Sequence, residues 1–146
     1  MGWLAQSQKI EMLKKVPLFA NLSKRQLGLV AKLSYEIPFP AHKALAREGD
    51  RGREFYILLE GQARVEKGGK VIGKLGKGDF FGEIAIIDGH RSATVITETP
   101  VKALGMSSKS FDQLLDGAPE ITKKLLYAVC SYLRMREGST TSAAGL

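Results

Sequence analysis

The chain has few of the residues that build disulfides and metal centres. Its 146 residues include one cysteine, Cys130, and two histidines, His42 and His90. One cysteine cannot form an intrachain disulfide, so we expect a reducing compartment, with Cys130 as a packing residue of a helix. Two separated histidines are too few for a cluster of imidazole and carboxylate ligands, so we expect no bound metal. The composition therefore argues against a secreted, disulfide-stapled protein.

Long hydrophobic runs are also missing. No stretch of the sequence approaches the roughly 18 consecutive apolar residues that a membrane-spanning helix needs. Residues 1–15 lack the unbroken apolar core of a secretory signal peptide. The chain starts with Met1-Gly2, but Gln6 stands where an N-myristoylation signal requires serine or threonine. These absences lead us to expect a cytoplasmic protein without a membrane span.

Acidic residues are outnumbered by basic ones. The chain carries 22 Lys and Arg against 15 Asp and Glu, which is a formal net charge of +7. This balance favours anionic partners, such as nucleotides, nucleic acids or acidic surfaces, and it also serves solubility, so charge alone does not choose among them. The length suits one globular domain that buries its own core.

Helical patterns are confined to the two ends of the chain, and the first of them covers residues 1–33. A loose amphipathic pattern stops at Pro17, because proline breaks a helix interior. A second helix starts at Ser23, which together with Gln26 forms the sequence pattern of a capping box. We therefore expect an N-terminal segment of two helices.

Residues 108–138 contain the second helical pattern. We expect a short helix capped by a serine, a break at 117–119 (Gly-Ala-Pro), and then a longer final helix. One apolar stripe marks that final helix: Ile121, Leu125, Ala128, Val129 and Tyr132. Residues 139–146 are small and polar, and we expect them to form a disordered tail.

Residues 34–107 show the pattern of short strands separated by turns. Gly68 and Gly69 join two alternating segments and indicate a tight hairpin. Residues 47–50 (Arg-Glu-Gly-Asp) indicate another tight turn, in which we expect Glu48 to be structural. The predicted strands are 35–39, 54–59, 63–67, 70–75, 93–97 and 101–106. No helix lies between them to cross a parallel sheet, so the pattern favours a β-sandwich or barrel.

One segment places charged residues inside an apolar run. Residues 80–95 contain Gly82, Glu83 and Arg91 among phenylalanines, isoleucines and alanines. The guanidinium of arginine can grip a phosphate with two parallel hydrogen bonds, and it stays charged at any working pH. Backbone amides near Gly82 and Ala85 can add anion-binding donors. Glu83 is better explained as an acceptor for a sugar hydroxyl, so the segment suggests a site for a phosphorylated ribose.

The order of these residues resembles the phosphate-binding cassette of cyclic-nucleotide-binding domains. That family opens the cassette with Phe-Gly-Glu-Leu/Ile-Ala and closes it with Arg-Ser/Ala/Thr-Ala-x-Val, and residues 81–85 and 91–95 carry both patterns. Further matches follow in family order: Val16–Ser23, Phe39–Ala41, Arg47–Asp50, Glu54–Leu58, Glu60-Gly61 and Gly78–Glu83. The resemblance runs from about Leu13 to about Arg134, which is nearly the whole chain.

This resemblance implies the fold and the ligand. The fold would be mainly β, a double-stranded β-helix or jelly-roll β-roll of eight strands, flanked by N- and C-terminal α-helices in one domain. The ligand would be cAMP, because in this family a threonine directly after the arginine is associated with cGMP, and this chain has Ser92 at that position. Binding of cGMP remains an alternative. The ribose and phosphate contacts would be Gly82, Glu83, Ile84, Ala85, Arg91, Ser92 and Ala93. No cofactor besides this ligand is implied.

The remaining contacts concern the nucleobase and a lid. Position alone suggests Val71 and Leu75, with Ile84, as apolar walls for the base. The final helix should close over the base, with Tyr127, Tyr132 and Arg134 as its candidate lid residues. One departure from the family lies in the cassette: Arg91 follows Glu83 by only eight positions, where close relatives usually show nine or more.

The sequence favours a regulatory binding module in signal transduction over three alternatives. A cupin-type enzyme shares a similar β-roll but needs a metal cluster, and no Ser-His-Asp or Cys-His set is present, so we expect no enzyme activity. A DNA-binding regulator would need a further domain, so we expect no DNA binding from this chain. A degenerate module that binds proteins without nucleotide is the serious rival, because the cassette is short. The effector domain or partner protein stays open.

Overall fold

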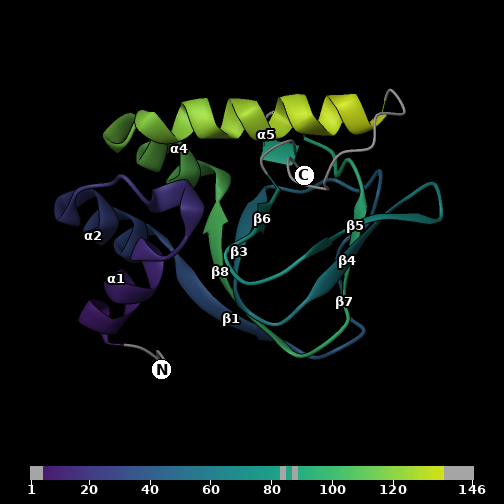
Figure 1. The fold of residues 1–146 in the computed structure, drawn as a ribbon, viewed down its shortest axis with the longest axis horizontal. Coiled ribbons are helices and arrows are strands. Elements are labelled where there is room, and N and C mark those ends of the chain that lie inside the picture. The colour runs from purple at the N-terminus through teal and green to yellow at the C-terminus, as the bar shows by residue number, and fades with distance from the viewer. Residues whose placement is uncertain (1–4, 83–84, 87–88, 137–146) are drawn as a thin grey trace.

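Two antiparallel β-sheets of four strands each form the centre of the molecule (Figure 1). The computed structural model describes residues 5–82, 85–86 and 89–136. One sheet has the strand order β1-β8-β3-β6, and the other has the order β2-β7-β4-β5. The strands are β1 (Tyr35–Phe39), β2 (Ala44–Ala46), β3 (Glu54–Glu60), β4 (Ala63–Lys67), β5 (Lys70–Leu75), β6 (Phe80–Phe81), β7 (Thr94–Thr97) and β8 (Val101–Ser107). The predicted mainly β roll is confirmed.

The strand pairs are nested in the sequence. β1 pairs with β8, β2 with β7, β3 with β6, and β4 with β5, all antiparallel. The chain therefore resembles one long hairpin rolled over itself, with the turn between β4 and β5 as its tip. Gly68 and Gly69 form that turn with φ values of 59° and 80°, as expected for a two-residue hairpin connection.

Two strands were missed by the sequence analysis. β2 has three residues and β6 has two, and neither is long enough to show a period-two pattern. Both strands exist because of partners distant in the sequence: Ala46 lies opposite Val95, and Phe81 lies opposite Tyr56. The pairing of β6 places the start of the cassette beside β3.

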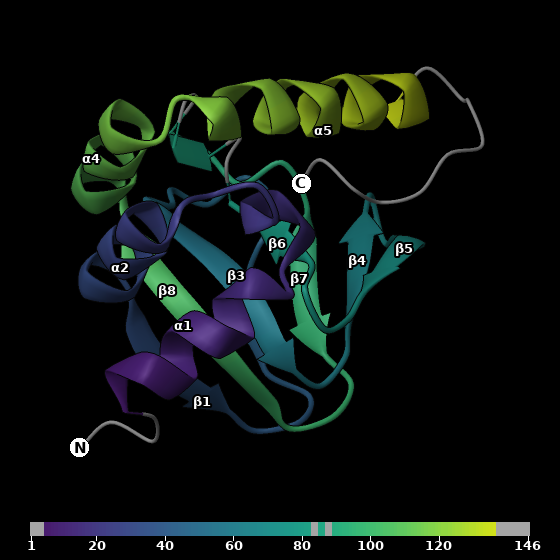
Figure 2. The ribbon, with the colours of Figure 1, turned by 60° about the vertical axis from the view of Figure 1, so that its left-hand side comes forward.

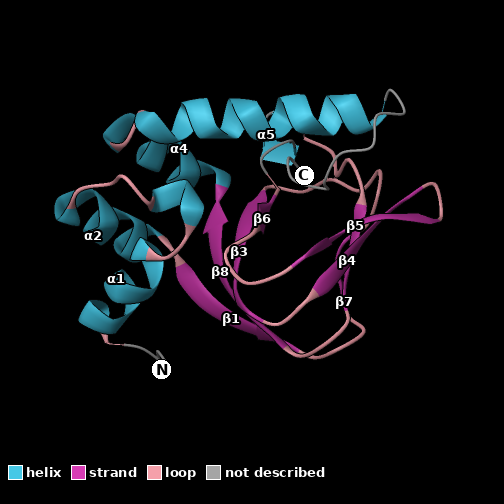
Figure 3. Cartoon of the chain, viewed as in Figure 1, coloured by secondary structure: helices cyan, strands magenta, loops and turns pink. Residues whose placement is uncertain are grey.

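Helices flank the strands at one side and one end of the roll (Figure 3). They are α1 (Gln6–Lys14), the short 3-10 helix η1 (Pro17–Phe19), α2 (Lys24–Leu33), α4 (Ser108–Gly117) and α5 (Glu120–Arg136). The predicted capping box is confirmed, since Ser23 Oγ accepts from the Gln26 N–H at 3.1 Å and Gln26 Oε1 accepts from the Ser23 N–H at 2.9 Å. In the described part of the chain no helix has the length and apolar character to cross a membrane.

β3 separates two apolar clusters and contributes to both. Phe55, Ile57 and Leu59 face the helices, while Leu58 faces the interior of the roll. This alternation follows from the period of a strand, and it explains why β3 is apolar on both faces. Figure 2 shows α1 and α2 packed across the sheet that contains β3 and β8. The ring of Phe55 lies 4.7 Å from that of Phe111 in α4, centroid to centroid, so α4 packs directly on the strand beside the cassette.

α5 lies across one end of the roll (Figures 1 and 2). Among its described side chains, Ile121, Leu125 and Ala128 are buried, which confirms those members of the predicted stripe. Its start is tied to the N-terminal helices, because Lys124 Nζ donates to the carbonyl oxygen of Pro17 at 2.7 Å. Leu126 and Tyr127 point outward, with 61% and 69% of their surface exposed.

The prediction that Cys130 is a packing residue is wrong. The thiol-bearing side chain is exposed on α5. Cys130 follows the buried Ile121 by nine positions, which at about 100° per residue places it about 180° around the helix, on the opposite face. The helical pattern was recognised correctly, but the face was assigned without allowing for this phase.

Candidate functional site

Arg91 is a buried charged residue in the segment between β6 and β7. Its exposed fraction is 8%, which is rare for an arginine and requires polar partners. Of the other predicted contacts, Gly82, Ala85 and Ala93 are buried, and Ser92 is half-buried. Glu83 and Ile84 lie outside the described residues. The structure thus brings the opening and the close of the cassette together around the Arg91 side chain.

The backbone of Arg91 is held by the loop between β2 and β3. The Arg91 N–H donates to the carbonyl oxygen of Asp50 at 2.7 Å, and the Gly49 N–H donates to the carbonyl oxygen of Arg91 at 2.9 Å. Gly49 has a φ of +87°, a conformation that glycine adopts without steric cost. The predicted turn at residues 47–50 is therefore a clamp on the backbone of the arginine.

The Arg91 guanidinium packs against backbone in a space that two glycines leave open. A Cβ at Gly52 would overlap Arg91 Nε, and a Cβ at Gly82 would lie 3.0 Å from Nη1. The Nη1 group donates to the carbonyl oxygen of Glu54 at 3.1 Å. The side chain is therefore held by steric confinement as well as by hydrogen bonding.

Aromatic rings lie beside the guanidinium. Arg91 Cζ lies 5.9 Å from the centroid of the Phe81 ring, within the range of a cation–π contact. The Phe81 ring lies 5.2 Å from that of Tyr56, which lies 6.0 Å from that of Phe39. Burial raises the pKa of Tyr56 to about 12, with the phenol of Tyr35 adding to the shift, so Tyr56 stays neutral at physiological pH.

The segment that contains Gly82 and Ala85 turns tightly. The Ile86 N–H donates to the carbonyl oxygen of Gly82 at 3.1 Å, and the Gly89 N–H donates to that of Ala85 at 2.6 Å. Gly82 has a φ of +109°, so the chain leaves β6 through a conformation that a residue with a Cβ would strain. This tight path is how the short cassette returns to Arg91.

Ser92 connects the cassette to the β4–β5 hairpin. Lys67 Nζ donates to the carbonyl oxygen of Ser92 at 2.7 Å and lies 3.2 Å from Glu48 Oε2. The Gly68 N–H donates to Glu48 Oε1 at 2.9 Å. This bond, with the nearby Lys67 ammonium, lowers the pKa of Glu48 below its usual value. Glu48 is therefore bound to the hairpin turn, consistent with the structural role expected for it.

The predicted base and lid residues are spread over the hairpin and α5. Leu75 is buried in the interior of the roll, whereas Val71 is 54% exposed on β5. Tyr127 and Arg134 are exposed on α5. The side chain of Tyr132 lies outside what the structure describes. The structure therefore groups the described members of the predicted phosphate site but does not pack Tyr127 over them.

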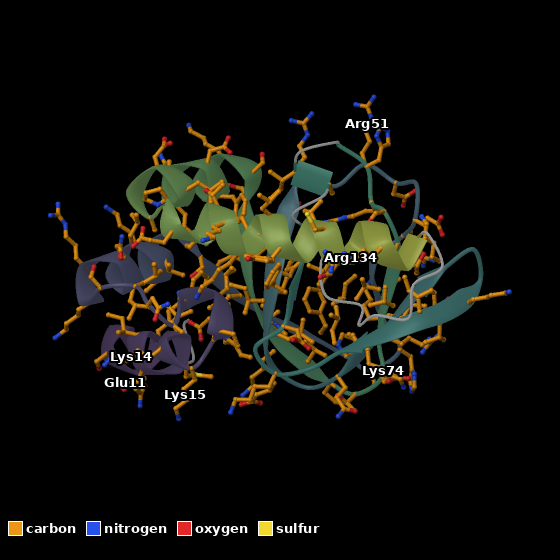
Figure 4. The ribbon with its side chains drawn as sticks, turned by 45° about the horizontal axis from the view of Figure 1, so that its top comes forward. Glu11, Lys14, Lys15, Arg51, Lys74 and Arg134 are labelled. Atoms are coloured by element: carbon orange, nitrogen blue, oxygen red, sulfur yellow. The ribbon has the colours of Figure 1, made fainter. Side chains whose placement is uncertain are left out.

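Sequence reasoning missed two features of this site. Gly52 leaves room for the Arg91 side chain, and Lys67 holds the carbonyl of Ser92. Gly52 stands between two arginines, Arg51 and Arg53, and nothing in that local pattern marks it as a contact of a residue 39 positions later. Figure 4 shows Arg51 pointing outward from its loop. Such contacts depend on the tertiary fold.

Two cavities lined by described residues lie away from the cassette. One, of about 210 Å³, lies between Lys15 and Lys77 over an apolar floor that includes Leu58. The other, of about 660 Å³, runs along α2 beside Gly117. Neither includes a predicted ligand residue. Within residues 5–82, 85–86 and 89–136, no three His, Cys, Asp or Glu side chains gather as a metal site.

A family model described as "Cyclic nucleotide-binding domain" matches residues 36–117, which is more than half of the chain. This match includes both sheets' strands and the whole cassette. The chain therefore belongs to the family of cyclic nucleotide-binding domains.

Similar proteins include kinase regulators. Over 114 residues the chain is 35% identical to the cAMP-dependent protein kinase regulatory subunit of Schizosaccharomyces pombe, covering 77% of this chain and 28% of that protein. It is 31% identical over 131 residues to the cGMP-dependent protein kinase egl-4 of Caenorhabditis briggsae, covering 84% and 18%. The solved structure of cAMP-bound PfPKA-R matches with a TM-score of 0.85 at 27% identity, covering 91% of this chain and 46% of that one. The chain spans less than half the length of each of these proteins.

Proposed function

We propose that the chain is a regulatory module that binds cAMP and transmits binding through its C-terminal helix. The observation that carries the proposal is the buried Arg91, which is held on its backbone by Gly49 and Asp50 and confined at its side chain by Gly52 and Gly82. A guanidinium kept in one place at this burial suits a ligand that brings a phosphate charge. Similarity to a cAMP-dependent kinase regulator supports cAMP as the ligand.

Each part of a cyclic nucleotide would meet a different group. Arg91 would bind the phosphate, assisted by the N–H groups of Ser92 and Ala93. Glu83 would accept from the 2′-hydroxyl of the ribose, and Gly82, Ile84 and Ala85 would approach with their backbone. A guanidinium has five donors, and one of them binds the Glu54 carbonyl.

The nucleobase would contact the hairpin and the final helix. Val71 and Leu75 would form its apolar wall, and Tyr127, Tyr132 or Arg134 would cover it when α5 moves. Because α5 is anchored at its start by Lys124 and Gln26, its C-terminal half, which exposes Tyr127 and Arg134, would be the part that moves. The ligand can shift this equilibrium only by its difference in affinity for the two positions.

The output of the module would belong to a partner or to another domain. The similarity to kinases and their regulatory subunits supports a kinase-type effector. We predict no enzyme activity and no DNA binding from these residues, and the single cysteine supports a reducing, cytoplasmic location. The chain would form one domain with four segments: an N-terminal helical segment (1–33), the β-roll (34–107), the lid helices (108–138) and a tail (139–146).

The second candidate is a module that holds partners without nucleotide. The observation that favours it is the spacing of eight positions from Glu83 to Arg91, which is shorter than the resemblance to the family led us to expect. The backbone bonds to Gly49 and Asp50 speak for the first candidate, because they hold the arginine firmly in spite of the short loop.

Calorimetric titration of the chain with cAMP, cGMP and 2′-deoxy-cAMP separates the two candidates. We expect saturable binding of cAMP at one site, weaker binding of cGMP, and weaker binding of the 2′-deoxy compound because Glu83 loses its donor. Absence of heat with both cyclic nucleotides, in a protein that unfolds cooperatively, would reject nucleotide binding. Equal affinity for cAMP and its 2′-deoxy analogue would reject only the role of Glu83.

A further inference from the structure

Three segments meet at the ammonium group of Lys67, the last residue of β4. It donates to the carbonyl oxygen of Ser92 at 2.7 Å, just after the phosphate-binding arginine. It also pairs with Glu48 Oε2 at 3.2 Å, in the loop between β2 and β3. Glu48 Oε1 accepts from the N–H of Gly68 in the hairpin turn. We call Lys67, Glu48 and the Ser92 carbonyl the Lys67 clamp.

The Lys67 clamp holds the Ser92–Ala93 peptide, and the peptide before it, Arg91–Ser92, is already held by Gly49. The carbonyl of Arg91 accepts from Gly49, and the next carbonyl, that of Ser92, accepts from Lys67. The described residues contain no cis peptide bond, and in a planar trans peptide the N–H points opposite to the C=O. Holding these two carbonyls therefore sets the direction of the N–H groups of Ser92 and Ala93.

We propose that Lys67 is a positioning residue for the phosphate subsite, acting through the Ser92–Ala93 peptide. The inference rests on the proposed function. The ammonium holds the carbonyl on the side of the hairpin, which aims the Ala93 N–H to the opposite side, where the ligand phosphate would lie. A cation at the carbonyl also polarises the peptide and strengthens its N–H as a donor. Lys67 thus contributes to phosphate binding without touching the phosphate.

Glu48 connects the Lys67 clamp to the hairpin turn. Its carboxylate balances the charge of Lys67, whose side chain is only 29% exposed, and it ties the hairpin turn to the β2–β3 loop. That same loop holds the backbone of Arg91 through Gly49. These bonds therefore link three segments: the β4–β5 hairpin that carries Val71, the β2–β3 loop, and the end of the cassette at Ser92. Together the three segments would span the base end and the phosphate end of the site.

Lys74 offers a matched comparison on the neighbouring strand. It forms an ion pair with Glu98 at 2.9 Å, and its side chain is 65% exposed. Among the described residues, its hydrogen bonds reach the two oxygens of that carboxylate and no carbonyl of the cassette. Exposed pairs of this kind contribute little to stability, so Lys74→Met removes a lysine of the same sheet without disturbing the clamp.

The test compares the 146-residue chain with Lys67→Met, Lys67→Arg and Lys74→Met. Calorimetry with cAMP is expected to show about tenfold weaker binding for Lys67→Met, recovery to within about threefold for Lys67→Arg, and a change below about twofold for Lys74→Met. Thermal unfolding is expected to show similar, small effects of Lys67→Met and Lys74→Met. Unchanged affinity of Lys67→Met, or no recovery by Lys67→Arg, would overturn the inference.

A second readout needs no ligand. In a nitrogen–proton correlation spectrum of the free protein, the Ala93 amide proton should move upfield in Lys67→Met, remain near its original shift in Lys67→Arg, and stay unchanged in Lys74→Met. If the original chain binds no cyclic nucleotide, the proposed function fails, and this signal still decides whether Lys67 orients the peptide. If the chemical shift of the Ala93 amide proton were unchanged in Lys67→Met, the positioning role would be overturned, whatever the affinity for cAMP.

Discussion

Arg91 illustrates how one buried charge can be prepared for a ligand. Its backbone is bonded on both sides to residues 49 and 50, and its guanidinium lies between two glycines beside the Phe81 ring. Such burial costs free energy unless polar partners are present, and the Glu54 carbonyl supplies one of them. A phosphate that binds here meets an arginine whose position is already set, so little ordering cost falls on the binding step.

Removing the Arg91 guanidinium should weaken cAMP binding strongly. We expect Arg91→Ala to lose about 2–5 kcal/mol of binding free energy, the usual range for deleting one partner of a buried charge pair. Arg91→Lys should bind better than Arg91→Ala but below the original chain, because lysine keeps the charge and loses the planar fork. Calorimetry measures both, with the exposed Arg51→Ala as control. Equal affinity of Arg91→Ala and the original chain would contradict the assignment.

Gly52 should tolerate no side chain. In Gly52→Ala the new Cβ would overlap Arg91 Nε, so the arginine must move, and we expect a loss of about 1–3 kcal/mol in unfolding free energy together with weaker cAMP binding. Gly76→Ala is the control, since a Cβ there meets nothing within 4 Å. Denaturant unfolding and calorimetry test this. If the two alanine variants behaved alike, the confinement of Arg91 by Gly52 would be refuted.

Glu48 should make stability depend on acid pH. Its bond to the Gly68 N–H and the nearby Lys67 lower its pKa in the folded state, whereas in the unfolded chain it should titrate near the usual value of about 4.3. The stabilisation is therefore complete above the unfolded pKa and is lost as the pH falls through the folded pKa. Because the side chain is partly exposed, we expect less than about 1 kcal/mol.

The measurement for Glu48 is thermal unfolding between about pH 3 and pH 7. The original chain should be more stable than Glu48→Gln at neutral pH, and the two curves should converge in acid. A difference that stayed constant over this range would show that the charge of Glu48 is not responsible.

At the scale of elements, the nested strand pairs determine which segments share the site. Because β3 pairs with β6 and β2 pairs with β7, the loop between β2 and β3 lies beside the segment between β6 and β7. The β4–β5 hairpin is the innermost of the nested strand pairs, and it contacts Ser92 through Lys67. α5 crosses the end of the roll, anchored at its start and exposing Tyr127 farther along.

Binding should order the C-terminal half of α5 more than its start. Amide hydrogen exchange with saturating cAMP should slow at residues 127–132 and change little at 121–125, because Ile121 and Leu125 are already buried. Arg91→Ala with the same cAMP concentration is the control and should show less slowing. Uniform protection of the whole helix, or none, would contradict a lid that closes about its anchored end.

At the scale of the whole molecule, two apolar clusters share β3, and the site lies next to that shared strand. One cluster joins β3 and β8 to the helices, and the other fills the roll. A ligand that bridges residues from β6, β7 and the loops therefore stabilises the entire domain rather than one loop. The stabilisation follows from mass action, because only the folded state has the site.

Saturating cAMP should therefore raise the melting temperature. At a free concentration of 100 times Kd the gain is about 2.7 kcal/mol, which for a domain of this size corresponds to roughly 5–11 °C. cGMP at the same concentration should give a smaller shift, and Arg91→Ala should give a much smaller shift with either compound. Scanning fluorimetry or calorimetry measures the effect, and an equal shift for Arg91→Ala would show binding elsewhere.

Much of the architecture could be predicted from local patterns. The capping box of Ser23, the hairpin at Gly68-Gly69 and the burial of Ile121 follow from capping chemistry, positive φ and helical period, which act between neighbours in the chain. β2 and β6 could not be predicted, because two or three residues become a strand only when a distant strand pairs with them. The exposure of Cys130 was mispredicted because hydrophobicity alone does not set the phase of a helix face.

The sequence by itself determined the helices and the longer strands, the order of residues in the cassette and the arginine at position 91, since these follow from residue types and short spacings. The family model that matches residues 36–117 is the family that these sequence patterns indicated. Only the tertiary structure decided which groups hold the arginine: Gly52 beside its side chain, Asp50 and Gly49 on its backbone, and Lys67 on the next peptide. These contacts join positions 25 to 42 residues apart, and such pairs become neighbours only after the nested strands have paired and the roll has closed.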